Sequence, residues 1–168
     1  MDTELAFSPR TAAMLAHAAE LCQSRGARLT ALRHDVLGLI LEAAAPTGAY
    51  ELLDRLRAHR GPAAPPTVYR ALGFLLQQGL IHKVERLAAF VGCLEDAGHA
   101  HAAQFLICGK CGGVREMEDA ALATALAAAA ARVGFAVARA TIEAEGICAA
   151  CAAAAALPRV SRQSLPAR

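Results

Sequence analysis

Apolar residues recur every three or four positions through the first half of the chain, which is the spacing of one face of an α-helix. This pattern predicts four helices, over residues 8–25, 30–45, 50–59 and 67–78, with Ser8 and Thr30 as N-caps. Gly79 ends the fourth helix because glycine tolerates a positive φ. Two short apolar runs, 80–84 and 88–91, then predict a two-stranded hairpin.

The second half of the chain has a different pattern, in which short strands alternate with alanine-rich helices. Strands are expected over 105–107 and around 114–117, followed by a helix over 118–133 that stops at Gly134. A further strand is expected over 135–144 and a last helix over 149–156. The fold class is therefore α+β.

The last three of these helices, followed by the hairpin, have the element order of a winged helix. This fold places one helix in the DNA major groove. The helix over 67–78 would be that recognition helix. Its first turn carries Thr67, Tyr69 and Arg70, whose side chains can donate to phosphates or base edges. Propensity alone leaves the alternative open that Tyr69 and Arg70 only cover the helix surface.

Composition narrows the class of protein. The 168 residues carry a net charge of +2, but residues 25–86 contain nine Lys and Arg against five Asp and Glu. The positive mean hydropathy comes from alanine, and neither a signal peptide nor a membrane span is expected. We therefore expect a soluble, cytoplasmic protein without membrane association, in a compartment that keeps thiols reduced.

Four of the six cysteines form two Cys-x-x-Cys pairs, Cys108 with Cys111 and Cys148 with Cys151. Two residues between cysteines let both sulfurs bind one metal ion, and two such pairs complete a tetrahedral four-cysteine zinc shell with no open position. The alternative is two unrelated redox or core pairs. We favour a structural zinc site, and we expect Cys22 to be a small core residue.

Several motifs match one family in sequence order. They are Arg28-Leu29-Thr30, Pro-Pro-Thr-Val-Tyr-Arg-Ala-Leu at 65–72, Gln-Gly-Leu-Ile-His-Lys-Val-Glu at 78–85, and both cysteine pairs. The stretch from about Leu21 to Cys151 resembles the ferric uptake regulator family of metal-sensing repressors, and its zinc-sensing branch most of all. Ala31 departs from the proline that many members have there.

The resemblance implies a homodimer whose N-terminal winged helix binds a palindromic operator in double-stranded DNA. Arg28, with the first turn of the recognition helix, would contact that DNA. We therefore expect a DNA-binding domain over 1–91, a metal-binding hinge over 92–102 and a dimerisation domain over 103–157, and the composition of 158–168, with three arginines and no acidic residue, predicts a basic, disordered tail.

The resemblance also implies a second, regulatory zinc site, giving two Zn²⁺ per monomer. Its ligands by position would be His82, Cys93, His101 and Glu116, with His99 as an alternative to His101. Such a shell suits zinc better than magnesium or calcium. Taken singly, each of these residues also fits an ordinary surface position.

Other classes of function fit less well. Nucleobase deamination needs a His-x-Glu motif and a Pro before Cys-x-x-Cys, and neither is present. Thiol oxidoreductase chemistry would explain neither two cysteine pairs nor the winged helix, so no enzyme activity and no small-molecule substrate are expected. The remaining alternatives are a sensor of iron, nickel or peroxide from the same family, or a structural zinc module that docks another protein.

Overall fold

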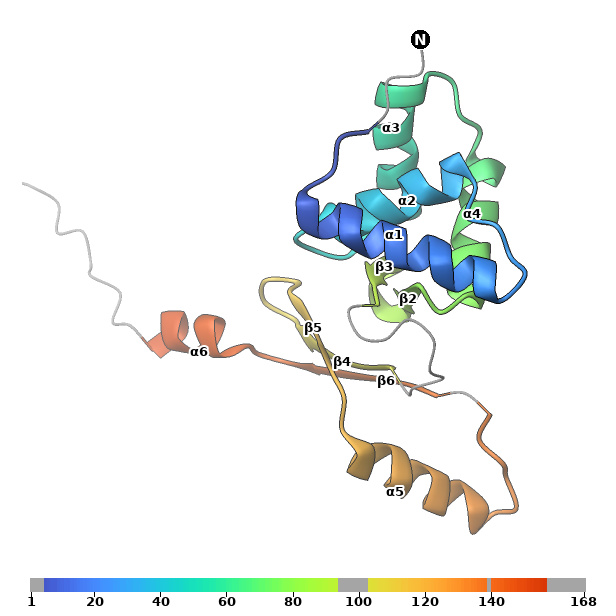
Figure 1. Cartoon of the computed structure of the whole chain (residues 1–168). Coiled ribbons are helices and arrows are strands. Elements are labelled where there is room, and N and C mark those ends of the chain that lie inside the picture. The colour runs from blue at the N-terminus through green and yellow to red at the C-terminus, as the bar shows by residue number, and fades with distance from the viewer. Residues whose placement is uncertain (1–4, 94–102, 139, 157–168) are drawn as a thin grey trace, which may run out of the picture.

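The computed structural model describes residues 5–93, 103–138 and 140–156. Its N-terminal half contains four helices and a small sheet (Figure 1). The helices are α1 (Pro9–Ser24), α2 (Ala31–Glu42), α3 (Ala49–Arg60) and α4 (Pro65–Gln77). The sheet has the antiparallel order β1-β3-β2, formed by β1 (Thr47–Gly48), β2 (Ile81–Val84) and β3 (Ala89–Gly92). A short 3-10 turn, η1 (Glu85–Leu87), joins β2 to β3, and we call β2, η1 and β3 the wing.

The C-terminal half is a second three-stranded sheet with two helices. Its elements are β4 (Ala103–Cys108), β5 (Val114–Met117), α5 (Ala120–Ala131), β6 (Thr141–Gly146) and α6 (Ala149–Ala156). The strand order is β5-β4-β6, with β4 antiparallel to β5 and parallel to β6. Since parallel neighbours need a crossover, the chain passes through α5 before β6 joins the sheet (Figure 1).

One apolar core holds the helical half together. Leucines from three helices, among them Leu37, Leu52 and Leu72, are at most 1% exposed, and each contributes about 1.5–3 kcal/mol by burial. The Arg60 guanidinium pairs with the buried carboxylate of Asp35, which joins α3 to α2. Arg25 donates from Nη1 to the carbonyl oxygen of Gln78 at 2.7 Å, which ties the end of α1 to the end of α4. The shared core and the Arg25 hydrogen bond hold α4 against the other helices.

A second, smaller core lies between the wing and the C-terminal sheet. Its buried members are Val84, Ala103, Phe105 and Ile107, with Val91 and Val114 packed against them. Val84 and Val91 belong to the wing, and the other four belong to the C-terminal sheet. The wing is therefore packed directly against this sheet, as the positions of β2 and β3 in Figure 1 indicate.

The structure confirms the α+β class and the order of the predicted helices, and it corrects several details. Thr30 precedes α2 but its side chain makes no capping hydrogen bond, whereas the Ser8 side chain accepts from the Thr11 amide at 3.3 Å. The strand expected over 135–144 is wrong in its extent, because β6 pairs with β4 only from Thr141 onward. Strand β1 and turn η1 had no clear sequence signal.

Smaller shifts affect the helix ends. Helix α4 begins two residues earlier than expected, because Pro65 and Pro66 fit its first turn. Helix α5 begins after Asp119, whose carboxylate accepts from the Ala121 amide at 2.7 Å. Gly79 follows α4 with a positive φ of 68°, as expected for the glycine that ends this helix. Within the described residues, no helix has the length and apolar character needed to cross a membrane.

Candidate metal centres and nucleic-acid interface

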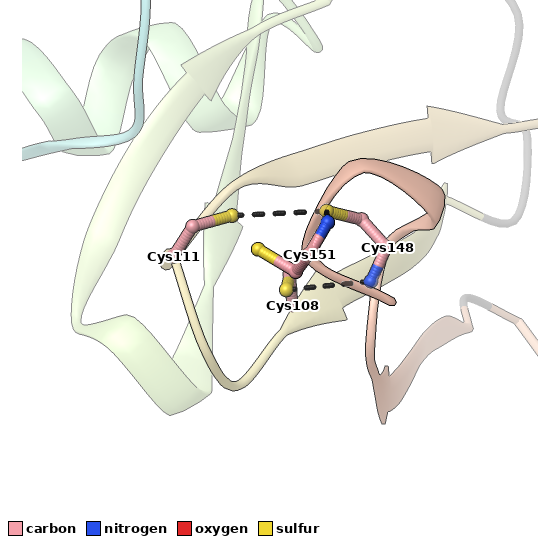
Figure 2. Close-up of side chains that lie close together, drawn as sticks. All are labelled: Cys108, Cys111, Cys148 and Cys151. Atoms are coloured by element: carbon pink, nitrogen blue, oxygen red, sulfur yellow. Dashed lines mark hydrogen bonds between the residues drawn. The ribbon is translucent and has the colours of Figure 1, made fainter. Parts of the chain in front are cut away.

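The four cysteines of the two Cys-x-x-Cys pairs come together at one end of the C-terminal sheet (Figure 2). Their sulfur atoms all lie within 4.8 Å of one another, and the Cys111 and Cys148 sulfurs are 3.9 Å apart. Four sulfurs placed tetrahedrally about 2.3 Å from one zinc ion would be about 3.8 Å apart. A disulfide needs about 2.05 Å, and all four cysteines are free thiols. The cluster therefore has the donor set and the spacing of a four-cysteine zinc site.

The parallel pairing of β4 and β6 brings the two distant cysteine pairs together. Cys108, the last residue of β4, is opposite Gly146, and the Gly109 amide donates to the Gly146 carbonyl oxygen at 2.9 Å. The residues that follow β4 and β6 form the two turns that carry the cysteine pairs. Gly112 closes the first turn with φ 70° and donates from its amide to the Cys108 carbonyl oxygen at 2.9 Å. The sheet register therefore fixes the geometry of the site.

Backbone donors surround the sulfur of Cys108. The Cys148 amide lies 3.4 Å from this sulfur, and together with the amides of Cys111 and Lys110 it lowers the pKa of Cys108 to about 6. The pKa of Cys151 is raised to about 12, chiefly by its contact with Cys148 and then with Cys111. The lowered pKa favours the thiolate form of Cys108. The raised pKa favours the protonated thiol of Cys151, whose proton a metal ion must displace.

A second group of possible ligands lies between the wing and the C-terminal sheet. His82 lies on β2, Cys93 directly follows β3, and Glu116 lies on β5. One ligand atom from each lies within 4.8 Å of the other two, and His82 Nε2 is 3.5 Å from a Glu116 carboxylate oxygen. Cys93 is buried and the other two residues are partly buried. This cluster joins segments from both halves of the chain.

Packing holds the members of this second cluster in place. The His82 ring meets the ring of Phe105 edge-on, with centroids 5.8 Å apart. The Cys93 amide donates to the carbonyl oxygen of Leu80 at 3.1 Å, which joins the residue after β3 to the residue before β2. The predicted ligand His101 and its alternative His99 lie outside the described residues. Three of the four predicted ligands are therefore brought together.

Helix α4 presents its predicted contact residues on the surface. Val68, Leu72 and Leu75 are buried, whereas Tyr69 is 50% exposed and Arg70 is exposed. Arg70 Nε donates to the Pro66 carbonyl oxygen at 3.3 Å. The structure places Thr67 in the same first turn, where it is partly buried.

Arg28 is exposed before α2, and a neighbouring arginine holds its backbone. Arg33 Nη1 donates to the Arg28 carbonyl oxygen at 2.7 Å, and the Arg33 guanidinium lies 3.5 Å from the centre of the Phe74 ring on α4. Sequence reasoning did not single out Arg33 or Tyr50, which is 69% exposed at the start of α3.

A family model described as the Ferric uptake regulator family matches residues 24–145. The chain belongs to this family of regulators. It is 43% identical over 141 residues to the Zinc uptake regulation protein of Escherichia coli (strain K12), covering 84% of this chain and 82% of that protein.

Solved structures show the same fold. A Zinc Uptake Regulator complexed with zinc and DNA is 41% identical, with a TM-score of 0.84, over 89% of this chain and all of that one (100%). The holo form of XcZur is 43% identical, with a TM-score of 0.78, over 84% of this chain and 98% of the other. The apo form of XcZur is 42% identical, with a TM-score of 0.50, over 84% of this chain and 97% of the other. The arrangement of this chain is therefore closer to the holo form than to the apo form.

Proposed function

We propose that this protein is a zinc-responsive transcriptional repressor of zinc-uptake genes, which binds palindromic operators in double-stranded DNA as a zinc-loaded homodimer. The observation that carries the proposal is the cluster of His82, Cys93 and Glu116, which joins the DNA-binding half to the C-terminal sheet. Its relatives include a protein named for zinc uptake regulation and a regulator solved with zinc and DNA. A regulator of this kind would act in the cytoplasm and would not be an enzyme.

The chemistry of the two clusters supports two zinc sites per monomer. Cys108, Cys111, Cys148 and Cys151 would hold a structural ion, since a complete thiolate shell leaves no position for substrate. His82, Cys93 and Glu116, with His101 or else His99, would hold the regulatory ion. One thiolate and one carboxylate balance the charge of Zn²⁺, and the mixture of nitrogen, sulfur and oxygen donors suits zinc.

The regulatory cluster gives a mechanism for control. Zinc bound there would supply a cross-link between the wing and the C-terminal sheet. His82 and Cys93 come from the wing side and Glu116 comes from β5, so the three side chains reach their common point only when the wing is docked. A docked wing fixes the direction of α4 relative to the sheet, and in a dimer this sets the spacing between the two recognition helices.

The C-terminal half has the surface expected of a dimerisation domain. Helix α5 consists of alanine, leucine and threonine, and none of its residues is buried within one chain. Leu106, Leu122, Leu126 and Phe135 are 45%, 43%, 38% and 65% exposed. A helix that is apolar on all sides is normally covered, so a second copy of this surface is the partner we propose. The proposed division is DNA binding over 1–91, hinge over 92–102 and dimerisation over 103–157.

Placing a charge on this surface is expected to weaken the dimer. In Leu126→Glu the carboxylate would be carried into the apolar interface, and the dimer dissociation constant should rise at least about 100-fold, because desolvating an unpaired charge is costly. Sedimentation equilibrium measures the change. Glu20→Gln, on the exposed surface of α1, is the control and should remain a dimer. A Leu126→Glu protein with unchanged self-association would contradict the assignment.

The operator would be contacted by Thr67, Tyr69 and Arg70 of α4, with Arg28 before α2 on the backbone phosphates. Arg70→Ala is expected to lower specific operator affinity about 10- to 100-fold, the value of one bidentate arginine contact with a base pair. Fluorescence anisotropy at fixed salt, with operator and scrambled duplexes, measures it. A matched control is Arg10→Ala, an exposed arginine in the first turn of α1. Equal losses on both duplexes would instead assign Arg70 to phosphate contact.

The experiment that tests the proposal is DNA binding titrated against buffered free zinc, with iron(II), nickel(II) and peroxide as separate effectors. Tight operator binding that requires zinc and no other effector is the expected result. A response to one of the others would make the chain a different sensor of the same family. Zinc binding with no effect on DNA would favour a structural module that docks another protein.

A further inference from the structure

One row of three residues crosses the C-terminal sheet and faces the wing. Glu116 on β5, Phe105 on β4 and Glu143 on β6 are opposite one another in the sheet register. Residues opposite one another on neighbouring strands project from the same face, so these three side chains share a face. Phe105 is 1% exposed and contacts the ring of His82, which belongs to the wing. The row therefore has the regulatory cluster at one end and Glu143 at the other.

Glu143 binds the wing through two backbone amides. One carboxylate oxygen accepts from the Glu85 amide at 2.6 Å, and the other accepts from the Arg86 amide at 3.2 Å. Both donors belong to η1, which is the turn that joins β2 to β3. Hydrogen bonds from amides to an ionised carboxylate are stronger than neutral ones. A metal ion is not needed for this contact.

An ion pair made two residues further along β6 adds little to this contact. Arg86 Nη2 lies 2.5 Å from a carboxylate oxygen of Glu145, but the two side chains are 56% and 44% exposed. Ion pairs exposed to this degree contribute little, because water screens them. Glu143 is partly buried, and its contacts are to the backbone. Although both hydrogen bonds are exposed to solvent, the Glu143 carboxylate joins β6 to two backbone amides of η1 at once.

We propose that Glu143 is a positioning residue for the DNA-binding half, acting through a metal-independent latch formed by its carboxylate and the amides of Glu85 and Arg86. This inference rests on the proposed zinc response. The latch lies on β6, the strand that leads into the second cysteine pair, and it holds the wing in the orientation that brings His82 to Glu116. It sets how far the docked wing is populated before the regulatory zinc ion binds.

The latch predicts a specific dependence of zinc affinity on Glu143. A ligand that binds only one conformation has an apparent dissociation constant equal to the intrinsic value divided by the population of that conformation. Weakening the latch lowers the population of the docked wing and so raises the zinc concentration needed at the regulatory site. The intrinsic chemistry of His82, Cys93 and Glu116 stays unchanged. Glu143 thus tunes the zinc threshold without touching the metal.

The test compares wild type, Glu143→Gln and the control Glu20→Gln as full-length dimers that retain structural zinc. Glutamine keeps one acceptor oxygen but turns an NH2 group toward the second amide. We expect the apparent zinc dissociation constant of the regulatory site, measured by competition with a chelator, to rise about tenfold. Hydrogen exchange at the Glu85 and Arg86 amides should speed up by a similar factor before the regulatory ion is added. The Glu20→Gln protein should match wild type in both.

A second variant separates the effect of side-chain length from the effect of charge. Glu143→Asp keeps the charge but is one methylene shorter, and it should resemble Glu143→Gln; it also replaces Glu143→Gln if that protein loses structural zinc. Unchanged zinc affinity and unchanged amide exchange in these variants would overturn the latch. If instead both quantities shift while wild type shows no zinc-dependent operator binding, the latch stands and the proposed function fails.

Discussion

Replacing Cys108 with serine is expected to unfold the C-terminal sheet and to abolish the dimer. Cys108 ends β4, and its sulfur lies beside the amide of Cys148, so it joins the two turns of the cluster. Structural zinc in small domains contributes on the order of 10–16 kcal/mol at neutral pH. This is as large as the whole unfolding free energy of a typical domain, about 5–15 kcal/mol. The same outcome is expected for Cys148→Ser.

Circular dichroism, zinc content and sedimentation together measure this effect. Cys22→Ser is the matched control, because Cys22 is fully buried in the helical half but is not part of either cluster. It should keep both zinc ions and lose only about 1–3 kcal/mol, the cost of burying a hydroxyl without a full set of partners. A folded, dimeric Cys108→Ser protein would show that the four-cysteine cluster does not support the fold.

Lowering the pH should release this structural ion from the wild-type protein. The pKa of Cys108 is lowered to about 6, so its thiolate persists to about that pH, whereas the pKa of Cys151 is raised to about 12 and its thiol ionises only when metal displaces the proton. Zinc affinity therefore falls as the pH falls, and more steeply below about pH 6. Zinc release followed with a chromogenic chelator across a pH series measures this dependence.

Removing a ligand from the regulatory cluster should leave the fold intact and abolish the zinc response. In Cys93→Ser or Glu116→Gln, the protein is expected to remain a dimer with structural zinc and to lose one zinc ion per chain. Substitution of partners outside the ligand shell already costs metal sites about 10- to 100-fold in affinity, so loss of a ligand should exceed about 100-fold. Operator affinity at fixed free zinc should fall accordingly.

Glu118→Gln gives a matched control for Glu116→Gln. Glu118 is exposed, directly follows β5 and has the same side chain, but it is not part of the cluster. In zinc titrations monitored through operator binding, Glu118→Gln should show the same zinc dependence as wild type. Equal loss of folding in the Cys93 and Cys108 variants would contradict the division into a regulatory and a structural site.

The sequence predicted the helical half well because its helices carry regular apolar spacing and clear stop signals. Leu52, Leu53 and Leu56 all turned inward as that spacing requires, and Gly79 took the expected positive φ. The two-residue strand β1 and the turn η1 are too short to leave a periodic signal. Their existence depends on pairing with distant segments.

The candidate sites show the same division between local and distant information. Cys-x-x-Cys spacing is local, so Cys108 and Cys111 could be paired from sequence alone. The proximity of His82 to Glu116 required the sheet register and the docking of the wing, and in sequence it was implied only by the family resemblance. Glu143 had no motif, because its partners are backbone amides that any sequence supplies.

The decisive measurement is zinc stoichiometry and operator binding, followed together on wild type and Cys93→Ser at fixed salt. We expect two zinc ions per wild-type chain and one per variant chain, with operator binding that appears only as the second ion is taken up. One zinc ion in both proteins, or operator binding that is indifferent to zinc, would contradict a repressor controlled by a regulatory zinc site.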